Sequence, residues 1–252
     1  MKKLVVFIGI LLFSVCFLNV YADEVYYTNG NGVVFTEGEY NFYTDMFWEG
    51  FQENVTQDML DTLNDYGFIG QPITTVEYDE DNTMGTLNPV YNPQGLVHET
   101  ASKKLAMSKS CTSSNCYISV VLTWKKQPNV KSYDVIGALL YGNLDLVGEP
   151  DTWLGYSGGT LFYGDEYYVG GGFGTSVKVQ TSTTYMQIGQ SYIVSGTGTL
   201  YASYQHATSN ITKATSQFYT VGYGGWGGVF HFYGNAVGKF DHMGGVNTYI
   251  SV

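Results

Sequence analysis

Apolar and polar residues follow two different patterns along the chain, and the change falls near residue 70. Before it, apolar residues recur at the three- and four-residue spacing of amphipathic helices. Thr36 and Glu39 form a capping box, which predicts a helix over residues 37 to 49. Thr56 predicts the start of a second helix, which ends before Gly67.

After residue 70 the apolar residues alternate with polar ones, and groups of Gly, Asn, Asp and Ser separate the clusters. Tyr117–Trp124 is the clearest strand, because it is rich in β-branched and aromatic residues. The predicted strands are residues 73–78, 103–110, 116–124, 132–141, 159–163, 167–170, 175–180, 185–194, 198–206, 217–222, 228–233 and 246–251. Many short strands with glycine-rich turns are typical of an antiparallel sandwich or jelly roll.

The predicted fold class is therefore α+β, mostly β, with an N-terminal helix pair packed on an antiparallel β-sandwich or jelly roll. Residues 1–22 are predicted to be a signal peptide, and residues 23–70 an acidic N-terminal segment with two short helices. Residues 71–252 are predicted to form a Gly/Tyr-rich antiparallel β domain. We expect the helices to pack on the sheet, because so short a segment rarely buries enough apolar surface alone.

The signal peptide is predicted from two lysines, the apolar run Leu4–Leu18 and small residues before a cut after Ala22. The run is short for a bilayer span, and no second run of spanning length follows it. We expect a secreted, extracellular protein without a transmembrane anchor after cleavage. In the alternative interpretation, Cys16 is the acylated residue of a lipoprotein, but the residue before it is not small.

The charge of the chain excludes several classes of partner. All 11 basic residues are lysines, and they oppose 22 acidic residues. Residues 23–102 contain 15 acidic residues and no basic ones, so this part of the chain is strongly anionic. A negative chain without arginine is unsuited to nucleic acid and to anionic lipid. The acidic surface is expected to keep an exported protein dispersed.

Two cysteines remain after the signal peptide, Cys111 and Cys116. Four polar turn-forming residues separate them, and strand-like segments flank them on both sides. An even number of cysteines in an extracellular protein indicates a disulfide, here one that joins the ends of a hairpin loop. Zinc would need further well-spaced thiols or histidines, so no metal site and no cofactor are predicted.

Catalytic motifs are absent from the sequence. The four histidines, none of them in a known catalytic motif, are His98, His206, His231 and His242. Asp134 is a carboxylate within an otherwise apolar strand and is the candidate buried acid. One alternative function is therefore a secreted polysaccharide hydrolase with paired carboxylates facing one cleft.

A short acidic loop is a candidate calcium site. Residues 79–82 combine three carboxylates with an amide, which are oxygen ligands of the kind that Ca²⁺ prefers. Met84 stands where the calcium-binding helix-loop-helix motif needs glycine. A solvated acidic turn is the preferred interpretation.

Aromatic residues flanked by glycine are the remaining signal. The candidate binding residues are Tyr168, Phe173, Tyr223 and Trp226. Rings on flexible glycine-rich loops can stack on sugars or on a protein surface, although glycines can also simply relieve crowding in a sheet. The leading hypothesis is a noncatalytic binding protein whose partner is an extracellular glycan or protein surface.

A third hypothesis concerns residues 175–206, which contain long segments with alternating Ser and Thr. Hairpins of this composition line the pores of some secreted β-rich proteins. Exposed strands of an ordinary sandwich have the same composition. Pore formation is therefore the least favoured of the three functions.

Overall fold

The computed structural model describes residues 25–75, 97–99, 103–157, 162–169, 171–211, 219–222, 229–241 and 245–252. For residues 97–99, 156–157 and 162–169 only the backbone is described. The predicted signal peptide and the acidic loop at residues 79–82 lie outside the described residues. No helix of the described ranges is long and apolar enough to cross a lipid bilayer.

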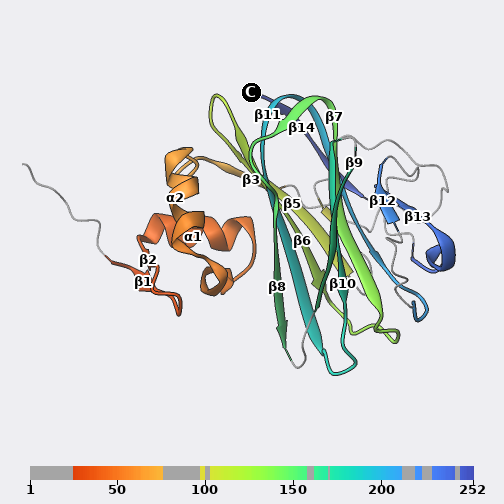
Figure 1. The fold of residues 1–252 in the computed structure, drawn as a ribbon. Helices are drawn as coiled ribbons and strands as arrows, with labels where there is room; N and C mark the ends of the chain where they lie inside the picture. Colours follow the sequence, from red (N-terminus) through yellow and green to blue (C-terminus); the bar gives the residue numbers. More distant parts are fainter. Residues whose placement is uncertain are drawn as a thin grey trace, which may run out of the picture.

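Both predicted helices are present (Figure 1). They are α1 (Glu37–Met46) and α2 (Gln57–Asp65), with the 3₁₀ turn η1 (Phe51–Asn54) between them. The capping box is confirmed: the Glu39 backbone N–H donates to the Thr36 hydroxyl, and the Thr36 N–H donates to the Glu39 carboxylate. These contacts satisfy donors that the first helical turn leaves unpaired.

The rest of the described structure is almost entirely antiparallel strand. The strands are β1 (Tyr27–Thr28), β2 (Val34–Phe35), β3 (Ile73–Thr75), β4 (Val97–Glu99), β5 (Lys103–Cys111), β6 (Cys116–Trp124), β7 (Tyr133–Leu146), β8 (Asp151–Ser157), β9 (Phe162–Val169), β10 (Gly172–Lys178), β11 (Tyr185–His206), β12 (Tyr219–Val221), β13 (Phe230–Phe232) and β14 (Val246–Ser251). A second 3₁₀ turn, η3 (Gly234–Ala236), follows β13. The predicted fold class, α+β and mostly β, is confirmed.

The 22-residue strand β11 organises the large sheet. Its first half pairs with β6 on one side and β8 on the other. Its second half pairs with β7 and β14. We call β3, β4, β5, β6, β8 and the first half of β11 sheet I. We call β7, β9, β10, β14 and the second half of β11 sheet II. The strand therefore passes from one layer of a sandwich to the other (Figure 1).

The main core lies between the two sheets. Strand β6 shows how the sequence builds it, because Ile118, Val120 and Leu122 point inward and are fully buried. Their neighbours Tyr117 and Val121 point to the opposite side of the sheet. This alternation is the period of two that the sequence predicts.

The helices cover the outer face of sheet I (Figure 1). Phe47 leaves the helical conformation, with φ −123° and ψ −97°, so α1 ends three residues earlier than predicted. Its ring and that of Trp48 lie over Gly189 of β11, where an added Cβ would be 2.9 Å from Trp48. Trp48 also covers Gly155 of β8. The glycines thus leave room for aromatic rings between helix and sheet.

The β12–β13 pair covers part of the outer face of sheet II, on the opposite side of the sandwich from the helices (Figure 1). Its Tyr219, Val221 and Phe230 form a third apolar cluster with Val135 and Leu139 of β7. The sandwich therefore has a covering layer on each side.

The disulfide is present as predicted and closes the loop between β5 and β6. Cys111 and Cys116 face each other in the strand register, with their Cα atoms 4.1 Å apart. The bond fixes the register of a hairpin that forms the centre of sheet I.

Candidate functional site

A row of tyrosine and hydroxyl side chains crosses the outer face of sheet II. Thr199 of β11 lies directly opposite Tyr249 of β14 on one side and Tyr141 of β7 on the other. Directly paired residues of neighbouring strands project from the same face of a sheet. Tyr141 is 66% exposed and Tyr249 is 59% exposed, so this row faces solvent.

The neighbouring row continues the same surface. Tyr201 is paired with Asn247 of β14 and Leu139 of β7. The Tyr201 ring meets the Tyr141 ring edge to face, with centroids 6.4 Å apart and planes at 78°. We call Tyr141, Thr199, Tyr201, Asn247 and Tyr249 together the tyrosine face.

Residues between these outward positions close the core beneath the tyrosine face. Leu200 is paired with Leu140 and with Thr248, and all three are buried. The alternation shows that the tyrosines are outside because the inward positions of the same strands are filled by the core. Figure 1 shows β14, β11 and β7 side by side at this end of the sandwich.

Glycine allows strands β7 and β11 to approach closely beneath the tyrosine face. Gly198 lies opposite Gly142, and a Cβ on Gly198 would be 2.1 Å from the backbone carbonyl oxygen of Tyr141. Gly142 has φ +94°, a conformation that other residues rarely adopt. The backbone that carries Tyr141 is thus fixed against β11.

The tyrosine face carries no charged side chain. Lys109 of β5 lies at its edge, where Nζ donates a hydrogen bond to the backbone carbonyl of Tyr249 at 2.9 Å. Burial lowers the pKa of Lys109. The lysine anchors β14 to the other sheet. The surface itself offers rings, a hydroxyl and an amide, which suit an uncharged ligand.

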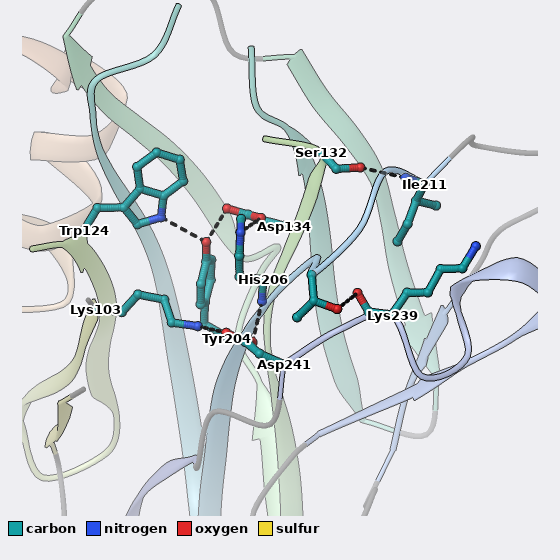
Figure 2. Close-up of polar contacts among 10 residues, drawn as sticks. Lys103, Trp124, Ser132, Asp134, Tyr204, His206, Ile211, Lys239 and Asp241 are labelled. Carbon is teal, nitrogen blue, oxygen red and sulfur yellow. Dashed lines mark hydrogen bonds and ion pairs between the residues drawn. The ribbon is translucent and has the colours of Figure 1, made fainter. Parts of the chain in front are cut away.

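A network of buried polar side chains lies within the sandwich (Figure 2). Asp134 of β7 is fully buried, as the sequence suggested, and both carboxylate oxygens have partners. The Tyr204 hydroxyl donates to one oxygen, and His206 Nδ1 lies 2.6 Å from the other. The Trp124 indole N–H donates to the Tyr204 hydroxyl at 3.1 Å. These contacts satisfy a carboxylate that burial would otherwise make costly.

The network continues to the C-terminal segment. The His206 backbone N–H donates to Asp241 at 2.8 Å, and Lys103 pairs with the same carboxylate. Lys103 Nζ also lies 5.2 Å from the centre of the Tyr204 ring. Six residues are thus joined, five from four strands and Asp241 from the C-terminal segment. Asp134 is fully buried and does not face an open cleft. The network therefore stabilises the fold.

Charge determines the protonation of His206. Burial alone lowers its pKa, but the hydrogen bond and negative charge of Asp134, with the charge of Asp241, outweigh burial and raise it. The positive charge of Lys103 lowers the pKa of His206. His206 is therefore favoured as the charged partner of Asp134 in the folded protein.

This ion pair predicts a pH dependence of stability. Because folding raises the His206 pKa above 6.5, its contribution is complete below that pH and is lost as the pH rises through the folded value. We expect wild type to exceed His206→Gln in melting temperature by more near pH 5.5 than near about pH 9. A difference in melting temperature that is the same at both pH values would contradict an ion pair between His206 and Asp134.

An open groove of about 520 Å³ lies between the β6–β7 loop, the β10–β11 loop and the segment that follows β11. It is lined by Gln127, Pro128, Asn129, Val130, Lys131, Thr181 and Asn210, none of which is aromatic. Lys131 Nζ donates to the Thr181 carbonyl at 2.6 Å, and Gln127 donates to the Thr183 carbonyl at 3.1 Å. These polar groups join the β6–β7 loop to the segment before β11.

The candidate aromatic residues from the sequence do not form a described site. Phe173 was predicted at a loop tip, and this is wrong, because its ring is fully buried in the main core. The side chain of Tyr168 and all of Tyr223 and Trp226 lie outside the described residues. His231 is exposed on β13. Sequence reasoning missed Tyr141, Tyr201 and Tyr249, although Tyr249 lies between Thr248 and the apolar Ile250 in an alternating last strand.

Comparison with known proteins gives no family assignment. No family model matches the chain, and no curated protein matches it. The chitin-binding domain of a hyperthermophilic chitinase from Pyrococcus furiosus has a TM-score of 0.23 and 14% identity, over 41% of this chain and 90% of that domain.

A structure from work on pH-induced modulation of Streptococcus parasanguinis adhesion by Fap1 fimbriae has a TM-score of 0.29 and 16% identity. It covers 57% of this chain and 79% of the other. Both scores are below 0.5, so neither similarity carries an argument about ligand or fold.

Proposed function

We propose that this protein is an exported, noncatalytic binding protein that recognises a neutral glycan through its tyrosine face. The observation that carries the proposal is the row Tyr249, Thr199 and Tyr141, in which two exposed rings flank a hydroxyl in strand register. Rigid aromatic rings supply contact area at a low cost in conformational entropy. Stacked sugar rings present C–H groups to them, while Thr199 and Asn247 offer hydrogen bonds to sugar hydroxyls.

Charge supports a neutral ligand. The chain has a net charge of −11, and the tyrosine face itself has no charged side chain. An anionic polysaccharide would be repelled by the protein as a whole and would find no cation on this face. Export is supported by the N-terminal sequence and by the disulfide, since such bonds persist in oxidising compartments.

The hydrolase alternative is not favoured by the described residues. Asp134, the candidate acid, is fully buried, and Tyr204 and His206 form hydrogen bonds with its carboxylate oxygens. A glycosidase needs two carboxyl groups that reach the substrate in one cleft. We therefore place Asp134 in the framework of the fold and not in a reaction.

The tyrosine face can be tested by substitution. We expect Tyr141→Ala and Tyr249→Ala each to weaken glycan binding about tenfold, because each removes a central ring contact. The double variant should show no measurable binding. The measurement is depletion of the protein by insoluble neutral polysaccharides, including cellulose, chitin and starch, followed by calorimetry with soluble oligosaccharides of the polymer that binds.

Tyr26→Ala is the matched control, because Tyr26 is 54% exposed but belongs to the N-terminal segment. It should bind as wild type does. Melting curves of all variants establish that they fold. The proposal fails if folded wild type binds none of the neutral polysaccharides, or if the double variant binds them with unchanged affinity.

A further inference from the structure

The spacing of the two exposed tyrosines selects a particular glycan geometry. Tyr249 and Tyr141 pair with the same residue, Thr199, from opposite sides. Their strands are therefore two strand spacings apart, which corresponds to about 9.6 Å across the sheet. A ligand that contacts both rings must repeat the same surface over that distance.

An extended β-1,4-linked chain of pyranose sugars has this property. Each residue advances by close to one strand spacing, and successive residues are turned over relative to one another. Every second residue therefore presents the same face. An α-1,4-linked chain curves into a helix and does not keep this repeat along a straight line.

We propose that the ligand is a linear β-1,4-linked polysaccharide whose chain crosses the strands of sheet II. This inference rests on the proposed function. Sugars one and three stack on Tyr249 and Tyr141, and the sugar between them lies over Thr199. The inference concerns the backbone linkage shared by cellulose-like and chitin-like polymers and does not depend on their substituents.

The residues of the tyrosine face indicate that the glycan chain crosses the strands and does not run along one of them. Along β14 the outward neighbours of Tyr249 are Asn247 and Ser251, so no second ring follows at the next outward positions of that strand. Tyr201 is partly buried, and its edge-to-face contact supports the Tyr141 ring from the side. Among the side chains that the structure describes, the row through Thr199 is the one that places two exposed rings at this repeat.

The experiment compares linkage and length by calorimetry. Wild type should bind cellohexaose or chitohexaose at least about tenfold more tightly than maltohexaose, the α-1,4-linked hexamer. Within the better β-linked series, affinity should rise sharply between the disaccharide and the trisaccharide. The trisaccharide is the shortest ligand that reaches both Tyr249 and Tyr141.

Substitution identifies the source of the length step. Tyr141→Ala and Tyr249→Ala should each abolish the gain from disaccharide to trisaccharide, while Tyr26→Ala retains it. Equal affinity for maltohexaose and the β-linked hexamers, with binding still dependent on both tyrosines, would overturn this inference and leave the proposed function intact. Persistence of the length step in either tyrosine variant would also overturn it. Absence of all glycan binding would reject both proposals.

Discussion

Asp134→Ala should lower the free energy of unfolding by about 3–5 kcal/mol, the usual cost of breaking a buried ion pair by removing one partner. His206 would lose its counter-charge, and the Tyr204 hydroxyl would lose its acceptor. Both side chains are buried, so water cannot replace the carboxylate without opening the sandwich. Urea denaturation followed by circular dichroism measures the loss.

Asp145→Ala is the control, because Asp145 is an exposed acid of the same strand, β7. It should change stability by less than about 0.5 kcal/mol. If Asp134→Ala does not yield folded protein, Asp134→Asn keeps the shape of the side chain and allows the same measurement. A loss below about 1 kcal/mol for both Asp134 variants would contradict a stabilising role of the network.

The helix pair and the central hairpin could be predicted because their signals are local. Thr36 and Glu39 are three residues apart, and the capping box they form is present. Tyr117–Trp124 is rich in β-branched and aromatic residues and coincides with most of β6. In each case, neighbours along the chain determine the structure, so no knowledge of distant partners is needed.

The long strand β11 could not be predicted as one element. Residues 185–194 and 198–206 were predicted as separate strands, with Gly196 in the gap between them and Gly198 at the start of the second. In the structure these glycines lie within the strand, where it exchanges β6 for β7 as a neighbour. A Cβ on Gly196 would be 2.2 Å from the carbonyl oxygen of Asn143, so a partner strand requires the glycine.

Glycine also misled the prediction of Phe173. Gly172 and Gly174 suggested a flexible loop, but a Cβ on either would lie within 2.7 Å of the Val221 side chain. The glycines make room for β12 on the outer face, while Phe173 points into the core on the inner one. Whether a glycine marks a turn or a close contact depends on a neighbour that the sequence does not reveal.

The tyrosine face depends on register in the same way. Tyr141, Thr199 and Tyr249 come from three strands that are distant in sequence, and they meet only when those strands pair. The alternation within β14 shows which side chains share a face. It does not show which strands lie beside it. A one-residue shift of any strand would remove the row.

Phe51→Ala should lower the free energy of unfolding by about 3–5 kcal/mol, as expected for truncation of a fully buried phenylalanine. Its ring stacks on Phe47 with centroids 3.9 Å apart and meets Trp153 of β8 edge to face at 5.3 Å. Phe51 thereby joins the helical layer to sheet I, and a cavity at this point weakens the contact between them.

Urea denaturation monitored by tryptophan fluorescence measures this loss, because Trp48 and Trp153 both contact Phe51. Val34→Ala, at an exposed position of the same N-terminal segment, should change stability by less than about 0.5 kcal/mol. If Phe51→Ala does not fold, Phe51→Leu retains most of the apolar contact and should cost about 1 kcal/mol. An unchanged midpoint in the leucine variant together with a loss below about 1 kcal/mol in the alanine variant would show that another contact holds the helices on the sheet.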